Sequence, residues 1–295
     1  MARFNESVLV GWTSPASNSE QTKLENAERM VREAIKNDPK LSAMSIKLFG
    51  QGSYANDTNV RLNSDIDINA CFDGGFYFHL PNGKVRGDFG LDNPISYSFS
   101  EYKNDVYSAL VNCFGTSEVI RNDKCITIRA NSYRVETDVV PTWRHRRYSD
   151  DKSYVEGVYF VTDSGAIRKS YPEQHILNAR SKNQKTSRRF KWTTRIFRKI
   201  RYKMIEDGEP VSANISSFLI ECLIWNVPDH IFNNSTTWTE RVKECIKYLY
   251  NSTLSDDKCK EWGEVSELLY LFVGHKWSRE DVNSYMQQVW NYLQF

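Results

Sequence analysis

The chain has 295 residues, of which 40% are hydrophobic and 13% aromatic, so it is long enough to close a sizeable core as one bilobed domain or two small ones. The net charge is only +2, and neither a signal-peptide pattern nor a run of about 18 apolar residues occurs, which argues against secretion and a membrane span and predicts a soluble, cytoplasmic protein. The six cysteines form no C-x-x-C pair, which argues against a zinc site and a disulfide framework, so we expect reduced and mostly buried thiols.

The first part of the chain is expected to mix helices and strands. An apolar stripe with early acidic residues predicts a helix, and alternating apolar and polar residues predict strands. The expected elements are a helix at Ser19–Asn37, strands at Ser45–Phe49 and Asp65–Phe72, a loop at Asp73–Ser98, a helix at Ser100–Phe114, and strands at Ser117–Arg121, Cys125–Ala130 and Tyr133–Val140. Pro141 is expected to end the last strand, because proline donates no backbone hydrogen bond.

The remainder is expected to be helical, because apolar residues recur there at helical spacing. The expected helices are Ser187–Asp207, Ser216–Asn226, Trp238–Tyr250 and Arg279–Leu293. We therefore predict an α+β protein with a core at residues 1–170 and a helical lobe at residues 171–295. No linker rich in Pro, Gly or Ser parts them, which favours one compact body with a cleft between the lobes.

A basic segment lies between Arg180 and Lys203, where eleven Lys or Arg residues occur without an acidic one. Such a segment repels itself unless it is solvated or neutralised, so its expected partner is a polyanion, either nucleotide phosphates or a nucleic-acid backbone. A solvated helix face is the commoner meaning of a charge run. Apolar residues interleave at helical spacing, Phe190 and Trp192 among them, so one face is expected to pack while the other stays basic.

Two carboxylates, Asp65 and Asp67, lie two residues apart in an expected strand, so both side chains are on one face. An isolated pair of this kind is often only the solvent side of an edge strand. Upstream, Gly52 and Ser53 offer close backbone approach and a hydroxyl to a phosphate. Downstream, Asp138 lies among β-branched residues on a later strand. Together with the basic segment, these features favour a nucleotide site.

Phosphoryl and nucleotidyl transfer need such a set. Mg²⁺ prefers oxygen ligands, and two ions about 3.5 to 4 Å apart can activate an attacking hydroxyl and stabilise the leaving pyrophosphate. We predict that Asp65 and Asp67 bridge two Mg²⁺ ions, with Mn²⁺ as a substitute, and that Asp138 binds the metal on the acceptor side. His145 and His175 are interpreted as structural residues, because nothing near either one completes a catalytic set.

The spacing of Gly-Ser, Asp-x-Asp and the later Asp resembles the DNA polymerase β-like nucleotidyltransferases. The run Gln51–Asn59 followed by Ser64-Asp65-Ile66-Asp67 is similar to the bacterial CD-NTases, relatives of cyclic GMP-AMP synthase and oligoadenylate synthase. Collinear segments over nearly the whole chain resemble clade E of that family: Tyr154-x-Glu156-Gly157, Tyr171-Pro172-x-x-His175, Lys182-Asn183-Gln184, Ser217–Cys222 and Asn226–Asp229.

The resemblance implies a polymerase β-like core with a mixed sheet, a helical C-terminal lobe and an active site in the cleft between them. It implies a catalytic metal triad of Asp65, Asp67 and Asp138. The implied nucleotide-binding residues are Gln51, Gly52, Ser53, Ser170, Lys182, Arg198, Lys199, Ser217 and Phe218. Phe218 stands where relatives often carry a base-stacking Tyr, and either Arg198 or the adjacent Lys199 stands near a basic phosphate ligand.

The implied function is synthesis of a cyclic dinucleotide second messenger from ATP and GTP in CBASS anti-phage signalling. An effector would bind the product rather than the enzyme, which is expected to be a monomer that needs no nucleic acid and no membrane. In clade E, Asn before the Tyr-Pro pair goes with pyrimidines and Ser with purines, so Ser170 predicts a cyclic dipurine, cyclic di-AMP or cyclic GMP-AMP.

Three alternatives stay open from the sequence. The chain could be a cyclic UMP-AMP synthase, or a template-independent nucleotidyltransferase that acts on RNA or another hydroxyl acceptor. It could also be a catalytically silent nucleic-acid-binding protein, although a pure binder gains nothing from three converging anions beside phosphate.

Overall fold

The computed structural model describes residues 2–15, 17–60, 65–91, 95–274 and 277–295. The chain forms two compact units. The sheet unit comprises Ser17–Tyr54 and Ser64–Pro172, and the helical unit comprises Met1–Ala16, Ala55–Asn63 and Glu173–Phe295. The expected division at residue 170 therefore omits two segments of the N-terminal half, which belong to the helical unit. Ser64 of the Ser-Asp-Ile-Asp motif lies outside the described residues.

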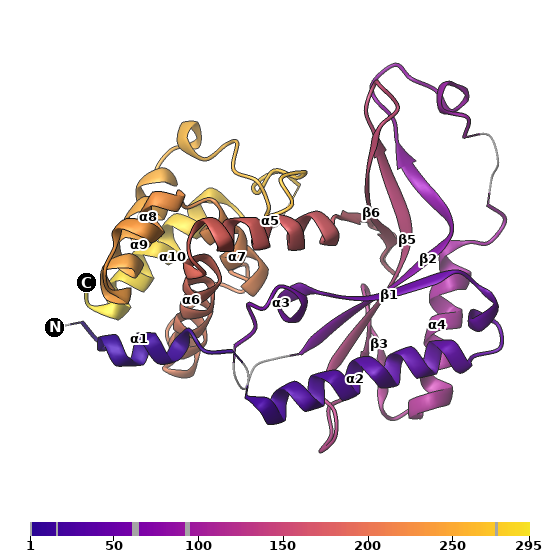
Figure 1. The fold of residues 1–295 in the computed structure, drawn as a ribbon, viewed down its shortest axis with the longest axis horizontal. Coiled ribbons are helices and arrows are strands. Elements are labelled where there is room, and N and C mark those ends of the chain that lie inside the picture. Colours follow the sequence, from indigo (N-terminus) through magenta and orange to yellow (C-terminus); the bar gives the residue numbers. More distant parts are fainter. Residues whose placement is uncertain (1, 16, 61–64, 92–94, 275–276) are drawn as a thin grey trace. The chain divides into compact units, whose positions relative to one another are not determined.

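Within the described residues, the sheet unit contains one mixed sheet of seven strands (Figure 1). The strands are β1 (Ile46–Gln51), β2 (Ile66–His79), β3 (Val119–Arg121), β4 (Ile126–Ile128), β5 (Thr137–Tyr148), β6 (Tyr154–Val161) and β7 (Ile167–Ser170). Their order is β1-β2-β5-β4-β3, and β6 pairs with both β5 and β7. β2 and β5 are parallel, whereas the other pairs are antiparallel. The predicted α+β class with a mixed sheet is confirmed.

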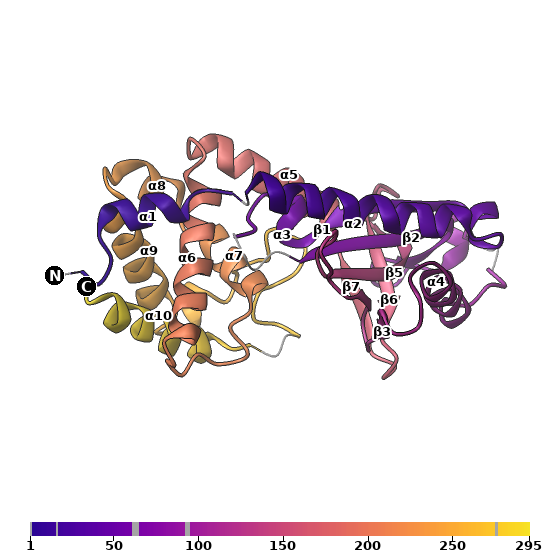
Figure 2. The same ribbon diagram turned by 90° about the horizontal axis from the view of Figure 1, so that it is seen from below.

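Two helices, α2 (Asn18–Asn37) and α4 (Phe99–Phe114), cover one face of this sheet (Figures 1 and 2). Both match the expected helices within one residue. Short 3-10 turns follow α2 at Leu41–Ala43 and precede α4 at Arg86–Phe89. Alternate residues of β2, namely Ile66, Ile68 and Ala70, are fully buried in the core beneath the helices. The intervening Asp67 and Asn69 therefore project from the opposite face, where the candidate site lies.

Two strands are longer than the sequence predicts. β2 continues past Phe72 to His79 with a register shift between Phe72 and Phe76, so the first part of the expected loop at Asp73–Ser98 is strand. β5 continues through Pro141 to Tyr148. Pro141 is tolerated because β4 pairs with β5 only as far as Val139, and β6 pairs with β5 only from Trp143 onward, which leaves Pro141 without a paired strand on that side. The expected end of the strand at Pro141 is therefore wrong, and β6 and β7 were not predicted.

The helical unit is built around a second apolar core. Its helices are α1 (Glu6–Trp12), α5 (Pro172–Lys185), α6 (Arg189–Glu206), α7 (Ser217–Trp225), α8 (Asp229–Asn234), α9 (Trp238–Ser252) and α10 (Arg279–Leu293), with a 3-10 turn at Asp256–Lys258. A four-residue helix, α3 (Gly52–Ala55), joins the two units in sequence. The four expected helices correspond to α6, α7, α9 and α10, and the helical C-terminal lobe is confirmed. Both chain ends meet in this unit, where the Arg3 amide donates to the Leu293 carbonyl at 2.9 Å (Figure 1).

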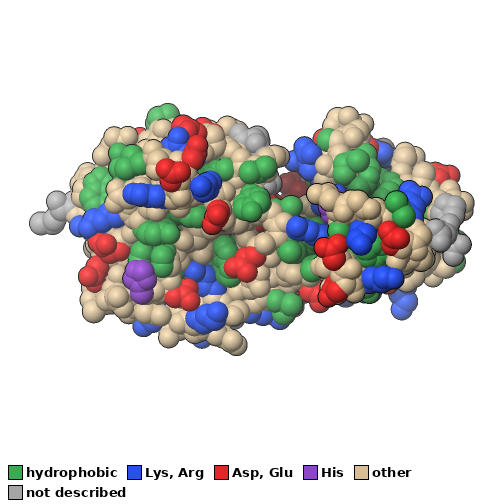
Figure 3. All heavy atoms as spheres, turned by 90° about the horizontal axis from the view of Figure 1, so that it is seen from above, with side chains coloured by type: hydrophobic (Ala, Val, Ile, Leu, Met, Phe, Trp, Pro, Cys, Tyr) green, Lys and Arg blue, Asp and Glu red, His purple; other side chains and the backbone are tan. Residues whose placement is uncertain are grey.

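The basic segment forms much of α5 and α6, and its charges differ from the expected pattern. Four of its cations are buried: Lys182, Lys191, Arg195 and Arg198. Arg195 holds residue 57 through the Asp57 carbonyl at 2.9 Å and its carboxylate at 2.5 Å. This contact joins residue 57 to α6 within the helical unit. On the face drawn in Figure 3, basic and acidic side chains are interspersed. Because the four buried cations lie among the buried apolar residues of α5 and α6, the packed side of these helices also carries positive charge, which corrects the expectation that it is apolar.

Within the part of the chain that the structure describes, no helix is both long enough and apolar enough to cross a bilayer. The six cysteines are free thiols, and four of them are buried: Cys71, Cys222, Cys245 and Cys259. Cys113 is exposed and Cys125 half-buried.

Candidate active site in the sheet unit

A row of polar residues crosses four neighbouring strands on the face opposite α2 and α4. Gln51 of β1 pairs with Asp67 of β2, Asp67 pairs with Asp138 of β5, and Asp138 pairs with Thr127 of β4. Residues that pair across neighbouring strands project from the same face, so the two carboxylates stand side by side. The β-sheet thus brings together two aspartates separated by seventy residues of sequence.

A relay of hydrogen bonds orients the Asp138 carboxylate. The Asn122 amide donates to the Thr127 hydroxyl at 2.7 Å, and that hydroxyl donates to Asp138 Oδ1. Because the Thr127 oxygen accepts from Asn122, its own proton is directed at Asp138. The carboxylate therefore has a defined orientation before any ligand binds.

A second relay orients Gln51. The Thr142 hydroxyl donates to Asn69 Oδ1 at 2.5 Å, and Asn69 Nδ2 donates to Gln51 Oε1 at 3.1 Å. Both Thr142 and Asn69 are fully buried. Because Asn69 uses the amide oxygen of Gln51, the amide NH₂ of Gln51 is the group left to donate to a phosphate oxygen or a base carbonyl.

Gly52 brings the backbone of the next segment against Asp67. Its φ is +66°, and a Cβ built on it would overlap with Asp67 Oδ2. Any larger residue would therefore displace this carboxylate and would also be strained in the left-handed region. Ser53, the second predicted phosphate contact, follows in α3.

A pocket of about 340 Å³ lies over the row. It is bounded by Asp67 and Asp138, by the apolar side chains of Val140, Val158 and Phe160, and by Ser170 at the end of β7. Gln51 also lines it. Four predicted site residues therefore meet here: Gln51, Asp67, Asp138 and Ser170. The pocket combines an anionic wall with an apolar one, which suits a nucleotide base beside a metal-bound phosphate.

Cys125 lines the same pocket but is not a nucleophile. Burial, and then the nearby Asp138 carboxylate, raise the pKa of its thiol to about 11. The group is therefore a neutral thiol at neutral pH, whereas nucleophilic attack requires the thiolate.

The donor set fits Mg²⁺ on the observed geometry. Asp67 and Asp138 pair across β2 and β5, so their side chains project from the same face, and Mg²⁺ commonly takes one or two carboxylates and completes its shell with water and substrate phosphate. Asp65 is exposed and lies one residue before β2. Among the described residues, no three Asp, Glu, His or Cys side chains are grouped closely enough to hold a metal ion by themselves. Strand pairing accounts for Asp67 and Asp138, and the triad with Asp65 stays a prediction.

The other five predicted nucleotide-binding residues lie in the helical unit. Lys182 is buried, where its ammonium donates to the Val227 carbonyl at 2.8 Å and pairs with Asp229 at 2.9 Å. Burial lowers its pKa although Asp229 opposes the shift. Lys182 therefore has internal partners, and its role in nucleotide binding stays a prediction.

Arg198 also has internal partners. It donates to Glu221 Oε2 at 2.6 Å and to the Thr58 carbonyl at 3.0 Å. Glu221 further accepts from the Thr58 hydroxyl at 3.0 Å and contacts His175 Nε2 at 3.1 Å. Burial alone would raise the pKa of Glu221, but the Arg198 charge and these hydrogen bonds hold it below its ordinary value. Arg198 is the counter-ion of a buried carboxylate, and the interpretation of His175 as structural agrees with this network.

Lys199, Ser217 and Phe218 stay predictions as nucleotide ligands. Ser217 lies 3.3 Å from the Tyr202 hydroxyl, and Lys199 is half-buried. The Phe218 ring is 37% exposed and lies beside His175, with ring centroids 5.9 Å apart. A half-exposed aromatic ring of this kind retains a face on which a base can stack.

Sequence reasoning missed Asn69, Asn122, Thr127 and Thr142, which orient the predicted residues. Their only signal was position on expected strands or beside them, and Asn69 already alternated with the apolar residues of β2. The register that places Thr127 beside Asp138 is a property of strand pairing, which the sequence pattern does not contain.

Comparisons with known proteins show what the chain is similar to. Residues 177–294 match a family model described as the cGAS/DncV-like nucleotidyltransferase C-terminal helical domain. The chain is 63% identical to a cyclic dipyrimidine nucleotide synthase CdnE of Cecembia lonarensis, with 100% of both chains covered. It is 36% identical to a cyclic dipurine nucleotide synthase of Elizabethkingia meningoseptica, with 98% of both chains covered. It also resembles the solved structure of Elizabethkingia meningoseptica CdnE cyclic dinucleotide synthase with GTP and Apcpp, with a TM-score of 0.83, 34% identity, and 99% of this chain and 100% of that chain covered.

Proposed function

Because the chain belongs to the bacterial CD-NTases, in their clade E, and is a nucleotidyltransferase that makes cyclic dinucleotides, we propose that the row of Gln51, Asp67 and Asp138 is its catalytic centre. The observation that carries this proposal is the pairing of Asp67 with Asp138 over a nucleotide-sized pocket. Asp65, one residue before β2, completes the proposed metal-binding set.

Asp67 and Asp138 would hold Mg²⁺, with Asp65 as a further ligand. When bound, the metal lowers the pKa of the attacking hydroxyl and neutralises charge on the leaving pyrophosphate. The Gly52 backbone and the Ser53 hydroxyl approach the donor phosphates, and the Gln51 NH₂ donates to an oxygen of the substrate. Thr127 orients the Asp138 carboxylate, which would hold the metal.

The reaction joins two nucleoside triphosphates. The oxygen of a 3′ or 2′ hydroxyl forms a bond to the α-phosphorus of the other nucleotide, the bond from that phosphorus to pyrophosphate breaks, and the hydroxyl proton passes to water. A second transfer of the same kind closes the ring. The protein contributes chiefly by positioning and electrostatic stabilisation.

Two observations favour different bases. The chain is 63% identical over its whole length to a cyclic dipyrimidine synthase, which favours a pyrimidine. Ser170, which was expected to select purines, is one wall residue, and a serine hydroxyl can donate to a uracil carbonyl as well as accept from an adenine amine. We therefore rank a product that contains a pyrimidine first, and a cyclic dipurine second on the strength of Ser170 alone.

Competition among the four nucleoside triphosphates tests both candidate products. The purified protein is incubated with equal concentrations of ATP, GTP, UTP and CTP, one labelled at a time, with Mg²⁺, and the phosphatase-resistant product is identified by mass spectrometry. UMP or CMP in the main product supports the first candidate, and a product of AMP and GMP alone establishes the second. Absence of any resistant product, under conditions where an active relative gives one, contradicts the proposed function. The double variant Asp67→Asn with Asp138→Asn serves as the blank.

We propose a role in CBASS anti-phage signalling on family membership alone. The enzyme would act as a monomer without nucleic acid or membrane, and a separate effector would bind the product. Turnover that requires added DNA or RNA would contradict this proposal. The molar mass measured by light scattering during size-exclusion chromatography tests whether the protein is a monomer.

A further inference from the structure

Three cations line the candidate active-site pocket together with Asp67 and Asp138. They are Lys124, Arg168 and Lys169. Their side chains are exposed, and within the described residues no acidic side chain forms an ion pair with any of them. Other cations on β5 differ, since Arg144 and Arg146 both pair with Glu156. Cations elsewhere in the sheet unit are neutralised by carboxylates, whereas the cations at this pocket remain available to bind an anion.

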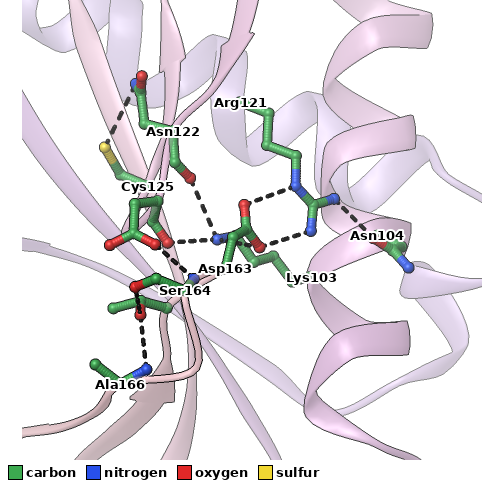
Figure 4. Close-up of polar contacts among 10 residues, drawn as sticks. Lys103, Asn104, Arg121, Asn122, Cys125, Asp163, Ser164 and Ala166 are labelled. Atoms are coloured by element: carbon green, nitrogen blue, oxygen red, sulfur yellow. Dashed lines mark hydrogen bonds and ion pairs between the residues drawn. The ribbon is translucent and has the colours of Figure 1, made fainter.

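The turn that carries Lys124 is held in place by a buried lysine (Figure 4). Lys103 of α4 is 2% exposed, and its ammonium donates to the carbonyls of Asn122 at 3.3 Å and Asp123 at 2.8 Å. It also pairs with the Asp163 carboxylate at 3.0 Å. A buried ammonium with three such partners fixes the backbone immediately before Lys124.

The same contacts tie this turn to the turn that leads into β7 (Figure 4). The Asp163 amide donates to the Asp123 carbonyl at 2.9 Å, and the Ser164 amide donates to the Asp123 carboxylate at 2.7 Å. Arg121 completes the connection with two bonds to Asp163, at 3.0 and 2.9 Å. The strand that bears Arg168 and Lys169 is therefore joined to the turn that bears Lys124.

Strand pairing directs one of these cations towards the apolar wall of the pocket. In the β6–β7 pair, Phe160 is opposite Arg168 and Val158 is opposite Ser170. Paired residues share a face, so Arg168 projects beside Phe160 on the side where Ser170 projects beside Val158. A nucleotide whose base packs against Val158 and Phe160 would place its phosphates within reach of Arg168.

We propose that Lys124 and Arg168 form a polyphosphate subsite that binds the phosphate chain of the second nucleotide. Lys169 is opposite Tyr159 and so projects from the other face of β7, where it is not part of the subsite. The proposal rests on the proposed function, in which Gly52 and Ser53 take the phosphates of the donor. A second triphosphate beside two aspartates needs its own cations, because several anions in one pocket repel one another strongly.

The first experiment measures binding of inorganic tripolyphosphate by calorimetry in EDTA, which removes binding through divalent metal at the aspartates. Lys124→Ala and Arg168→Ala should each weaken binding about fivefold, and the double variant about twentyfold, as exposed charge contacts typically do. Lys124→Arg should keep the affinity. Lys84→Ala is the matched control, because Lys84 is an exposed lysine of the same unit that does not line the pocket. The subsite would be overturned if both single variants and the double variant bound tripolyphosphate as tightly as the wild type. It would also be overturned if Lys84→Ala weakened tripolyphosphate binding as much as Lys124→Ala or Arg168→Ala.

The second experiment separates a nucleotide ligand from free pyrophosphate. Rates are compared for a second nucleotide with a 5′-triphosphate and for the same nucleoside without phosphate. The wild type should prefer the triphosphate through KM, and Arg168→Ala should reduce that preference about fivefold at similar kcat. An undiminished preference would mean that the cations hold released pyrophosphate instead, and would overturn the assignment to the second nucleotide. If no nucleotide is turned over at all, the proposed function fails, while the tripolyphosphate measurement still decides whether the subsite exists. Tighter binding of single-stranded RNA than of tripolyphosphate to the same cations would also overturn the proposal.

Discussion

The carboxylate of Asp67 occupies the space that a side chain at residue 52 would need. A Cβ on Gly52 would overlap with Asp67 Oδ2. Gly52 also has a φ of +66°, so its substitution has two separable costs, backbone strain and displacement of a carboxylate.

We predict that Gly52→Ala reduces turnover about a hundredfold, because displacing Asp67 by even a fraction of an ångström disturbs the metal-binding pair. Gly83→Ala is the matched control, since Gly83 has a φ of +80° and open space where its Cβ would be. Both variants should lose about 1 kcal/mol of stability from the left-handed backbone, measured by urea unfolding. Equal turnover in the two variants would show that the contact with Asp67 is unimportant.

Thr127→Val should lower kcat about tenfold to a hundredfold and raise the Mg²⁺ concentration needed for half-maximal rate. Valine keeps the shape of threonine but removes the hydroxyl that orients Asp138, and loss of an outer hydrogen bond to a metal ligand typically has this size. Thr127→Ser keeps the donor and should recover most of the rate. A Mg²⁺ titration that is the same for wild type and Thr127→Val would refute the relay.

Asp67→Asn together with Asp138→Asn should reduce turnover by on the order of a thousandfold or more, since the proposed metal loses both assembled ligands. The double variant should be as stable as the wild type or more so, because two adjacent carboxylates repel each other when no metal is bound. Thermal unfolding with and without Mg²⁺ checks this: Mg²⁺ should raise the Tm of the wild type and leave the variant unchanged. The same Mg²⁺ shift in both proteins would place the metal elsewhere.

Arg198→Met should destabilise the protein by about 3 to 5 kcal/mol, because it leaves the Glu221 carboxylate buried without its counter-ion. The double variant Arg198→Met with Glu221→Leu should recover much of that loss, since it removes both buried charges. Urea unfolding of the three proteins gives the comparison. Full stability of Arg198→Met with lost nucleotide affinity would instead restore the expected role as a phosphate ligand.

His145 should make stability depend on pH. It is 1% exposed, and burial, followed by the charges of Lys169, His79 and Arg147, lowers its pKa from 6.5 to about 4. The folded protein therefore binds fewer protons than the unfolded chain between those values. The stability that neutral His145 allows is fully present above about pH 6.5. As the pH falls to about 4, the free energy of unfolding should decrease by on the order of 2 to 3 kcal/mol from this residue. His145→Phe should flatten the unfolding free energy over this range relative to the wild type, and an unchanged slope would contradict the assignment.

Local patterns in the sequence determined the α+β class, the helices at α2, α4, α6, α7, α9 and α10, and the carboxylates Asp67 and Asp138. These are properties of neighbouring residues: helical or alternating spacing of apolar side chains is visible within about ten residues, and so is an Asp-x-Asp pair. Where a local rule conflicted with long-range pairing, the pairing decided. Pro141 lies within β5 because no strand neighbours it there on one side, and Asp73–His79 continues β2 because β5 pairs beside it.

Tertiary structure alone decided which predicted residues meet, and how each is used. Strand register brings Asp67, Asp138 and Thr127 into one row, although nothing in their sequence spacing specifies it. In the basic segment, tertiary structure instead decides what each charge does. Its charge density is plain in the sequence, but whether a cation faces solvent or a buried carboxylate depends on residues far along the chain. Arg198 meets Glu221 and Arg195 meets Asp57, so these cations hold the helical unit together. The free energy of a charge is set by its surroundings, and those surroundings are formed only when the chain folds.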